Sequence, residues 1–393
     1  MNMAQTPEVV VVGAGPASSW AAFRLARAGI RVVLVDGSHP REKPCGGGVT
    51  GRALALVDGA INAAQLPSRR ITAARFVDTT SDGRPQSIAV PLDDDALVVA
   101  SRMEFDGLLL AAACQAGAEL IRARALDVTS TAGGFVVHTG ESRIAAQRLI
   151  GADGANSLVR RRLARPFPRA DLSIATGFFA QGATSGDVIV ELAADPPGYM
   201  WSFPRPGHLA VGICAQADAG VTASDLRGRA RRWIYQMGLD PGARLEPYSW
   251  PIPSLTADGY RSLTVSGPGW FLTGDAAGLV DPITREGIYF ALRSAEFAAQ
   301  ASASAVAPEQ ASRVYRERVH DEITSDLAVA AKYKTGFFRP HFARLLIDAL
   351  RESAEVRAIM ADLIAGRRAY TTLKWSLLGT GEFGLAWRLL TSA

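Results

Sequence analysis

Residues 9–36 constrain this chain more than any other segment. They open with four consecutive valines, Val9–Val12, and such a β-branched run is typical of a strand buried on both faces of a parallel sheet. A glycine-containing turn at residues 13–18 follows at once, and residues 19–29 have the apolar spacing of a helix that lies on this sheet. A second strand then ends at Asp36. This order predicts a βαβ unit within an α/β fold.

The turn has the chemistry of a dinucleotide-binding site. Gly13 allows a tight turn, and Gly15 lets the backbone approach a pyrophosphate, which would face the N–H groups and the positive dipole of the following helix. Asp36 is placed to accept hydrogen bonds from a ribose. Ser18 occupies the third glycine position of this fingerprint and is small enough for close packing. The residues predicted to contact an adenine dinucleotide here are Gly13, Gly15, Pro16, Ala17 and Asp36.

A second glycine cluster follows Pro44 and Cys45. Three adjacent glycines leave no side chain to keep a ligand away from the backbone. The alternative is a flexible surface loop, but Pro44 stiffens its entry and cysteine is unusual in a solvated linker. We therefore expect the loop to pack against a flat cofactor ring. Cys45 would be either a proton donor or a small packing residue. The residues predicted at the reaction centre and the ring are Cys45, Gly46, Gly47 and Gly48.

Two later strand patterns also end in acidic loops, one at Asp153 and one at Asp275. Ligands of open α/β sheets bind outside the carboxyl ends of the strands, although Asp153 could instead simply cap a turn. Asp275 could bind a ribityl hydroxyl, and the helix after Gly287 could stabilise negative charge on a reduced isoalloxazine. The cofactor contacts predicted here are Asp153, Gly154, Gly274, Asp275, Pro282, Gly287 and Ile288.

A further helix is expected at residues 101–117. Ser101 is a plausible N-cap, and Glu104 lies at the third helical position, so the two would form a capping box. Arg102, in the first turn, would either reach a phosphate or flavin edge or be an ordinary surface charge. We count Arg102 among the predicted cofactor contacts.

The style of the sequence changes in two places. Residues 171–216 contain short strand patterns without helices between them, and residues 71–90 look like a hairpin around a turn at residues 81–85, so both predict an antiparallel sheet. The predicted organisation is a Rossmann-like cofactor domain (residues 1–70, 97–170 and 262–310), an inserted antiparallel-sheet substrate domain (71–96 and 171–261) and a helical region (311–393).

Apolar surfaces mark the substrate domain and the helical region. Tyr199, Trp201 and Phe203 alternate along one strand, so they share a face that is either core or the lining of an apolar pocket. The C-terminal region is rich in arginine and has broad apolar faces, with Trp375 and Trp387 among them. A helical lid and peripheral contact with a membrane both fit this pattern.

Composition excludes several other classes of protein. The 42 basic and 38 acidic residues give a net charge of +4, and the basic residues are dispersed rather than arranged in the basic–aromatic stripe of a nucleic-acid-binding protein. The three cysteines form neither a disulfide framework nor a zinc motif. No signal segment or membrane-spanning run is apparent. We expect a cytoplasmic protein, with or without peripheral membrane contact; no pattern specifies an oligomeric state.

The motifs at residues 13–18, Asp153 and Asp275 together resemble the three signatures of flavoproteins of the para-hydroxybenzoate hydroxylase type, whose cofactor is FAD. Arg102 and Asp106 also fall where that superfamily carries an arginine and an aspartate on a helix. The order and spacing of these motifs match over most of the chain.

A narrower resemblance is to the geranylgeranyl reductase family. It rests on the Pro-Cys-Gly-Gly-Gly loop at residues 44–48 and on residues 199–204, Tyr-Met-Trp-Ser-Phe-Pro, which are similar to the family's Y-x-W-x-F-P pattern and are followed by Gly212. Residues 274–292 and 365–370 are also similar to family segments. Arg285 departs from the pattern, because many relatives have glycine there.

This resemblance implies hydrogenation of isoprenoid carbon–carbon double bonds, with hydride from N5 of reduced FAD and a proton from Cys45 or an ordered water. No second glycine fingerprint is present, so NAD(P)H would visit transiently or another electron donor would serve. The substrate contacts that the resemblance implies are Tyr199, Trp201, Phe203 and Pro204.

Three other functions fit parts of the sequence. An FAD-dependent monooxygenase of an aromatic or apolar small molecule would share the cofactor domain, but the Cys45 loop favours a reductase. A flavin-dependent halogenase would need a lysine to carry the oxidised halogen, and Lys43 is the only lysine before Lys332. A flavin-binding electron carrier is the non-enzymatic alternative, and the aromatic strand face argues mildly against it.

Overall fold

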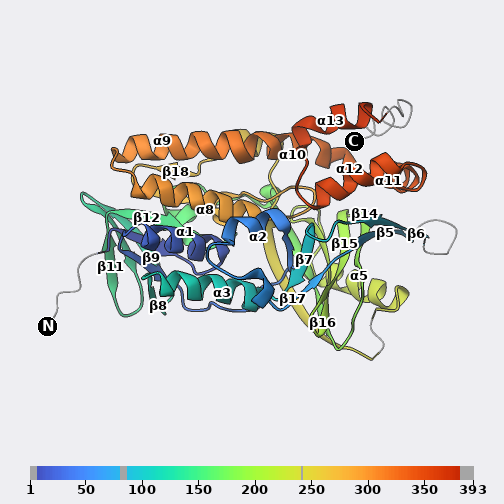
Figure 1. The fold of residues 1–393 in the computed structure, drawn as a ribbon, viewed down its shortest axis with the longest axis horizontal. Coiled ribbons are helices and arrows are strands. Elements are labelled where there is room, and N and C mark those ends of the chain that lie inside the picture. The colour runs from blue at the N-terminus through green and yellow to red at the C-terminus, as the bar shows by residue number, and fades with distance from the viewer. Residues whose placement is uncertain (1–6, 80–85, 240–241, 381–393) are drawn as a thin grey trace.

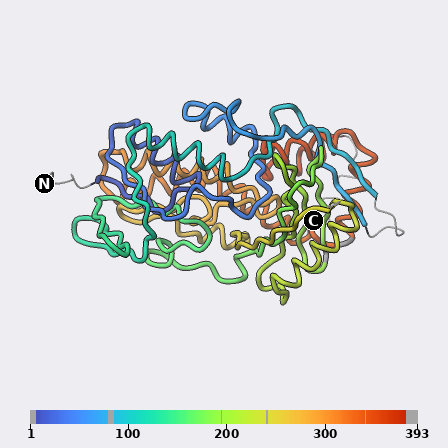
Figure 2. The backbone as a smooth tube through the Cα atoms, turned by 90° about the horizontal axis from the view of Figure 1, so that it is seen from below, coloured from blue at the N-terminus to red at the C-terminus, as the bar shows by residue number. Residues whose placement is uncertain are grey.

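The computed structural model describes residues 7–79, 86–239 and 242–380. Two large sheets lie at opposite ends of the molecule, and the C-terminal helices lie at the same end as the larger sheet in both perpendicular views (Figures 1 and 2). The fold is mixed α/β, as predicted. The expected turn at residues 81–85 lies outside the described residues.

The smaller of the two sheets has β1 at its centre, between β12 and β2 and parallel to both. Its four valines are at most 3% exposed, which confirms the predicted buried strand. Helices α1, α3 and α8 pack together beside this sheet, and a three-stranded sheet contacts β1 and β12. The six strands are, in spatial order, β18 (Ser266–Gly267), β19 (Trp270–Leu272), β12 (Arg148–Gly151), β1 (Val9–Val12), β2 (Val32–Val35) and β8 (Glu119–Ile121).

Two short sheets complete this half. The chain leaves the first sheet after Ile121 and begins a strand of another sheet at Asp127. The three-stranded sheets are β11 (Arg143–Ala146), β10 (Gly134–His138) and β9 (Asp127–Thr131), and β3 (Gly48–Thr50), β7 (Leu97–Ala100) and β4 (Ser68–Arg70).

The seven-stranded sheet combines the two segments of the predicted insertion. It is not wholly antiparallel, because β14 and β5 pair in parallel. One side of the sheet packs on α5, and the other contacts α11 and α12. The strands are, in spatial order, β17 (Arg244–Pro253), β13 (Leu172–Gln181), β16 (His208–Gln216), β15 (Pro197–Arg205), β14 (Val188–Ala194), β5 (Ala73–Asp78) and β6 (Gln86–Pro91).

The helices of the C-terminal region continue along the molecule from the smaller sheet to the larger one (Figure 1). A π-helical turn at His320–Thr324 joins α9 to α10. In the described part of the chain, no helix is both long and apolar enough to cross a membrane. The helices are α1 (Pro16–Arg27), α2 (Gly51–Val57), α3 (Arg102–Gln115), α4 (Leu158–Leu163), α5 (Ala223–Gln236), α6 (Ala257–Arg261), α7 (Gly274–Ala277), α8 (Ile288–Ala303), α9 (Pro308–Val319), α10 (Ser325–Phe337), α11 (Pro340–Glu352), α12 (Ala354–Ile364) and α13 (Tyr370–Leu378).

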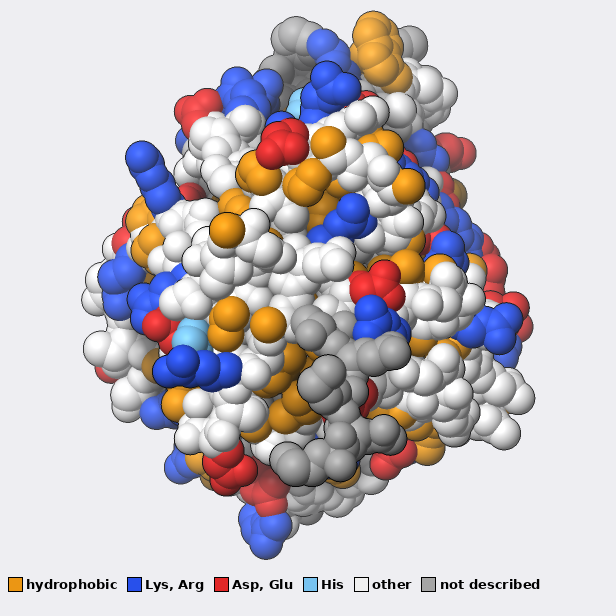
Figure 3. Space-filling view, turned by 90° about the vertical axis from the view of Figure 1, so that its left-hand side faces the viewer, with side chains coloured by type: hydrophobic (Ala, Val, Ile, Leu, Met, Phe, Trp, Pro, Cys, Tyr) orange, Lys and Arg blue, Asp and Glu red, His pale blue; other side chains and the backbone are white. Residues whose placement is uncertain are grey.

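Acidic and basic side chains are interspersed on the face of the molecule at the end of the smaller sheet (Figure 3). Many of the arginines on the protein surface are engaged in ion pairs, such as Arg162 with Asp127 and Arg293 with Glu322. The basic residues on this face are therefore balanced by neighbouring acids.

Candidate functional site

A cavity of about 970 Å³ connects the two halves of the molecule. Its lining includes the glycine turn after β1, the Cys45 loop, the aromatic face of β15 and side chains from the C-terminal helices. All the predicted site residues line it except Pro204 and Pro282. Both prolines are buried away from the cavity, so the predictions for these two residues receive no support from the structure.

One end of the cavity begins at the N-terminus of α1. No side chain caps this helix at Gly15, and Pro16 follows, so the first amide groups are free to meet an anion. Gly13 has φ of +109°, and a Cβ atom there would lie 2.5 Å from the carbonyl oxygen of Ala152. Only glycine fits this turn without strain, as the sequence predicted.

Asp36, at the end of β2, is held by the loop that follows it. Oδ1 accepts hydrogen bonds from the backbone N–H groups of Ser38 (2.6 Å) and His39 (2.8 Å), and Oδ2 lies 2.9 Å from Nδ1 of His39. Burial raises the pKa of this carboxyl, but the hydrogen bonds and the charge of His39 outweigh burial and hold the pKa well below its usual range. The carboxylate therefore stays ionised, as an acceptor for ribose hydroxyls must.

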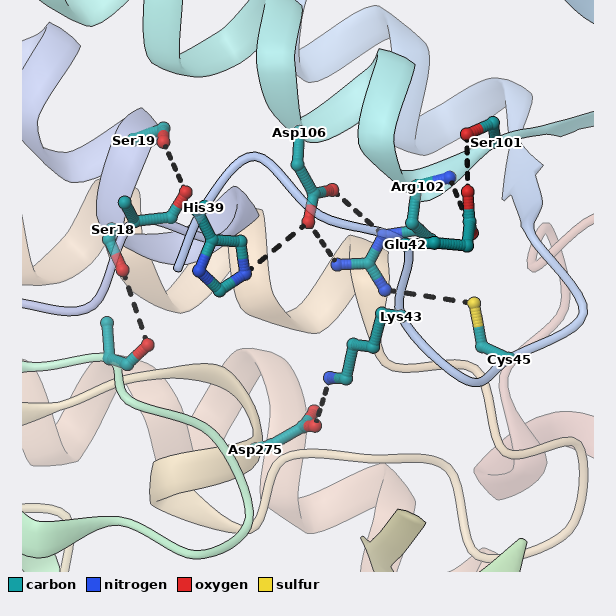
Figure 4. A network of polar contacts seen from close by, with 12 residues as sticks. Ser18, Ser19, His39, Glu42, Lys43, Cys45, Ser101, Arg102, Asp106 and Asp275 are labelled. Carbon is teal, nitrogen blue, oxygen red and sulfur yellow. Dashed lines mark hydrogen bonds and ion pairs between the residues drawn. The ribbon is translucent and has the colours of Figure 1, made fainter. Parts of the chain in front are cut away.

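His39 was not predicted from the sequence. Its Nε2 atom lies 4.0 Å from Oδ2 of Asp106 on α3, so the ring stands between Asp36, which borders the cavity, and the buried Asp106 (Figure 4). The only available sequence signal was its position three residues after Asp36.

Asp153 caps the start of a helix at the border of the cavity. Its carboxylate accepts hydrogen bonds from Ser157 Oγ (2.5 Å) and from the N–H groups of Leu158 (2.6 Å) and Val159 (3.3 Å). These bonds fix the start of α4, so the alternative of a capped turn is the one found. Asp153 and Gly154 still border the cavity.

Asp275 is paired with a lysine. Its Oδ2 atom accepts a hydrogen bond of 2.8 Å from Nζ of Lys43, which comes from the loop before Cys45 (Figure 4). Burial raises the pKa of Asp275, but the positive charge of Lys43 more than offsets this effect and lowers it. This pair joins two cofactor-facing loops that are more than two hundred residues apart in sequence.

The N-terminus of α8 faces the same part of the cavity. Gly287 is the N-cap residue and no side chain caps the helix, so its amide groups are available to a negatively charged ring edge. A Cβ atom at Gly287 would lie 3.3 Å from Oδ1 of Asp275. At Gly274, where φ is +55°, an added Cβ atom would lie 3.0 Å from the Cβ of Ala291. This glycine therefore lets the loop lie against α8.

These features together fit FAD. Two uncapped helix N-termini, an ionised carboxylate after β2 and glycines where side chains would block the approach all surround one cavity. When bound and reduced, FAD supplies a hydride. Gly13, Gly15, Asp36, Asp275 and Gly287 are the residues that would hold it.

The Cys45 loop is clamped between two arginines. Sγ of Cys45 lies 3.8 Å from Nη1 of Arg102 and 3.7 Å from Nη2 of Arg205. Arg102 is buried, and its Nε and Nη2 atoms each donate a hydrogen bond of 2.8 Å to Asp106 (Figure 4). The alternative of an ordinary surface charge for Arg102 is therefore wrong.

Arg205 was missed by sequence reasoning. It is fully buried, and its guanidinium donates to the carbonyl oxygens of Gly46 (3.1 Å) and Cys45 (2.6 Å) and to Glu42. A usable signal was present, because strand alternation places residue 205 on the same face as Tyr199 and Phe203.

Glu42 takes the place of the expected capping box. Its carboxylate accepts a hydrogen bond of 2.6 Å from Ser101 Oγ and one of 3.2 Å from the N–H of Arg102, so it caps α3 from another loop. Ser101 makes no cap hydrogen bond of its own. The capping box with Glu104 is wrong because a tertiary contact engages the serine.

Protein atoms explain the three glycines at residues 46–48. A Cβ atom at Gly46 would lie 2.8 Å from the ring of Phe203, and one at Gly47 would lie 2.3 Å from the carbonyl oxygen of Ala100. The glycines therefore let the loop pack against β15 and β7, in addition to leaving the backbone open to a ligand.

The other end of the cavity is apolar. Tyr199, Trp201 and Phe203 line it. Of the two alternatives for this strand face, core or pocket lining, the structure therefore supports the pocket lining. A Cβ atom at Gly212, on the neighbouring strand, would lie 2.5 Å from the Trp201 ring, so this glycine makes room for the indole.

The C-terminal helices close the apolar end. Their apolar side chains pack on β5, β6 and β14, as expected of a lid, and several face the cavity. The sequence showed apolar faces but could not show which surface they cover. The lining residues from this region include Phe337, Phe342, Leu346, Ile359, Leu363 and Leu377.

Comparisons with known proteins agree with this geometry. Residues 6–212 match the model of a family described as FAD binding domain. The geranylgeranyl diphosphate reductase of Rhodobacter capsulatus is 32% identical over 313 residues, 75% of this chain and 74% of that protein. The menaquinone reductase of Mycolicibacterium smegmatis is 33% identical over 313 residues, 75% of each chain.

A solved structure shows the same fold. The geranylgeranyl bacteriochlorophyll reductase-like protein of Thermoplasma acidophilum superposes with a TM-score of 0.80 and 23% identity, covering 95% of this chain and 99% of that one. The chain therefore belongs to the FAD binding domain family and, within it, to the geranylgeranyl reductase family of flavin-dependent oxidoreductases.

Proposed function

We propose that this enzyme hydrogenates carbon–carbon double bonds of an isoprenoid chain with reduced FAD. The observation that carries the proposal is the shape of one cavity, which is polar and glycine-lined at the end that fits FAD and lined by aromatic and aliphatic side chains at the other. An extended apolar chain could lie in the apolar compartment, with one of its double bonds next to the compartment that fits FAD. The two relatives named above are called reductases of geranylgeranyl diphosphate and of menaquinone.

Cys45 is the residue best placed to handle the proton. Its sulfur borders the junction of the two compartments and lies close to the guanidinium groups of Arg102 and Arg205. A thiolate left after proton donation would face these two positive charges, which would stabilise it. The hydrogen bonds that Arg205 donates to the carbonyl oxygens of Cys45 and Gly46 fix the backbone that carries this thiol.

The test is product analysis under anaerobic conditions. The purified holoenzyme is reduced with dithionite and supplied with geranylgeranyl diphosphate, and the products are resolved by mass. Products heavier by about two mass units for each bond reduced are expected, since hydrogenation adds a hydride and a proton. Unchanged substrate together with a hydroxylated product after admission of oxygen would instead support the monooxygenase.

The source of electrons is a finer part of the proposal. We infer that NAD(P)H reduces the enzyme transiently or that another donor does so. Stopped-flow reduction by NADPH, NADH and reduced ferredoxin would identify the donor from the rate at which the flavin absorbance is lost. If neither NADPH nor NADH reduces the flavin at a useful rate, the inference that NAD(P)H is the donor is contradicted. If reduced ferredoxin also fails, the donor is another carrier.

Peripheral membrane contact also remains a proposal. Trp375 on α13 is 71% exposed, while Leu373 and Leu377 of the same helix border the cavity. An exposed indole beside a channel for an apolar chain suits a lipid interface. Wild-type protein should co-sediment with anionic liposomes more strongly than Trp375→Ser, and equal sedimentation would contradict contact through this face. Trp387, the other tryptophan of the predicted apolar faces, lies outside the described residues.

A further inference from the structure

Two cations share one serine beside the cavity, and one of them, Arg285, lines it. Nη1 of Arg285, which precedes α8, donates a hydrogen bond to Oγ of Ser254. Nζ of Lys334, on α10, lies 3.2 Å from the same oxygen and 3.1 Å from the carbonyl oxygen of Ser254. Within residues 7–79, 86–239 and 242–380, no carboxylate forms an ion pair with Arg285 or Lys334.

The guanidinium of Arg285 keeps part of its hydrogen-bonding capacity unused. Its Nε atom is buried and has no partner among the described residues. Because Nη1 is engaged by Ser254, the edge formed by Nε and Nη2 remains. Such an edge presents two parallel N–H groups, which match two oxygens of a phosphate.

The backbone at Arg285 is strained. Its φ of +62° makes it the one non-glycine residue of the described chain with a positive φ. Glycine would adopt this conformation freely, whereas a residue with a side chain is strained there. A strained arginine whose charge no acid balances is best explained by a function of its side chain.

The surroundings connect this pair to the apolar compartment. Tyr199, from the aromatic face, donates a hydrogen bond of 2.8 Å to the carbonyl oxygen of Thr284, next to Arg285. Trp250 and Ile252 of β17 line the cavity and lead along the strand to Ser254. Arg285 therefore borders the space that suits the isoprenoid chain. Lys334 lies behind it, where Ser254 and the carbonyl oxygen of Leu255 (3.4 Å) engage its ammonium group.

We propose that Arg285 binds the phosphate or diphosphate head of the substrate, with Lys334 adding positive charge from behind Ser254, and that this site selects phosphate-bearing isoprenoids over uncharged ones. The proposal rests on the proposed function, because it assumes that the apolar compartment holds an isoprenoid chain. Ser254 orients both cations, and its own hydroxyl hydrogen is used in a bond of 3.1 Å to Oε1 of Gln216.

Binding to the oxidised holoenzyme tests the site without turnover. Calorimetry would compare geranylgeranyl diphosphate, geranylgeraniol and inorganic pyrophosphate. Arg285→Gly is expected to weaken the binding of geranylgeranyl diphosphate by about tenfold or more, the usual effect of losing one charged phosphate contact, and Lys334→Met by only a few-fold, since Lys334 contributes charge rather than a contact. Both variants should change the affinity for geranylgeraniol by less than about twofold. Arg285→Gly should keep or raise the melting temperature, because glycine relieves the strained φ.

Lys332→Met is the matched control, because Lys332 is exposed two residues earlier on the same helix. It should leave all three affinities unchanged. Unchanged diphosphate affinity in Arg285→Gly would overturn the proposal. Equal affinities for pyrophosphate and geranylgeranyl diphosphate, both dependent on Arg285, would also overturn it, because the site would then serve a free anion.

The proposed function fails in a distinguishable way. If geranylgeranyl diphosphate binds through Arg285 but is never hydrogenated, the head-group site stands and the reductase does not. If both lipids are hydrogenated equally well by wild type and by Arg285→Gly, the reductase stands and the head-group site does not.

Discussion

The two ends of the cavity are built in different ways. At the FAD end, the turn, the helix N-terminus and Asp36 all come from one continuous segment of under thirty residues. At the apolar end, the lining comes from β5, β14, β15, β17 and four C-terminal helices, which are spread over three hundred residues. A local motif thus specifies the chemistry, whereas tertiary packing specifies what can reach it.

If this contrast is right, adding one methyl group at the FAD end should have the largest effect, which is on FAD binding. Gly13→Ala places a Cβ 2.5 Å from the carbonyl oxygen of Ala152 in a backbone with φ of +109°. We expect near-complete loss of FAD, measured as flavin absorbance per polypeptide. Gly29→Ala is the control, since φ is +78° there but nothing lies within 4 Å. It should cost only about 1 kcal/mol of stability and retain FAD.

The junction between the ends depends on Cys45. Cys45→Ala should slow hydrogenation by about 10²-fold if the thiol donates the proton, the lower range for general acid catalysis, while FAD content stays unchanged. Single-turnover oxidation of the reduced flavin by substrate measures this rate. Full activity in both Cys45→Ala and Cys45→Ser would show that Cys45 only packs.

Arg205 links the two ends structurally. Arg205→Met leaves Glu42 and two carbonyl groups without their partner, so it should lower the free energy of unfolding by about 3–5 kcal/mol, as for other broken buried pairs. Urea titration measures the change. Arg244→Met, an exposed arginine on β17, should change it by less than about 1 kcal/mol, and equal effects would contradict the proposed role of Arg205.

At the apolar end, the effect of a substitution on the apparent KM should depend on the length of the substrate. Trp201→Ala removes an indole from the cavity wall and should raise the apparent KM for long prenyl chains by about tenfold, with a smaller effect on short ones. Tyr235→Ala, at an exposed site on α5, is the control. Identical changes for all chain lengths would refute the assignment of this compartment to the chain.

The smallest effect concerns pH at the cation pair. Burial and the charge of Arg285 lower the pKa of Lys334 to about 8, with Asp171 and Asp218 acting in the opposite direction. Lys334 is cationic below this pH and neutral above it, so affinity for geranylgeranyl diphosphate should fall a few-fold from pH 7 to pH 9. Calorimetry on Lys334→Met, which should lack this fall, corrects for titration of the ligand. An equal fall in the variant would contradict this assignment.

The sequence predicted the parts whose function depends on local backbone. The strand–turn–helix order and the need for glycine at position 13 were read correctly because each effect acts within a few residues, whereas the ribose contact of Asp36 stays a prediction. The aromatic strand face was recognised, but alternation could not tell a pocket from a core. Asp153 caps α4 and also borders the cavity, so its contact with the cofactor stays a prediction, because a capping aspartate and a ligand-binding aspartate look alike after a strand.

Long-range partners escaped prediction. Lys43 pairs with Asp275, and Glu42 with Arg205 and Ser101, across separations of about sixty to more than two hundred residues. Nothing in a single sequence reports such pairs, since their energies arise only once the sheets are assembled. Arg205 was missed as well, although its place on the aromatic face of β15 could have been read from strand alternation.

The most direct test of the account asks whether the two ends of the cavity form one reaction site. The holoenzyme is reduced under anaerobic conditions, geranylgeranyl diphosphate is added, and the flavin absorbance near its oxidised maximum is followed. The account predicts that the substrate alone restores the oxidised flavin, at a rate that Trp201→Ala slows. A flavin that stays reduced until oxygen is admitted would contradict it.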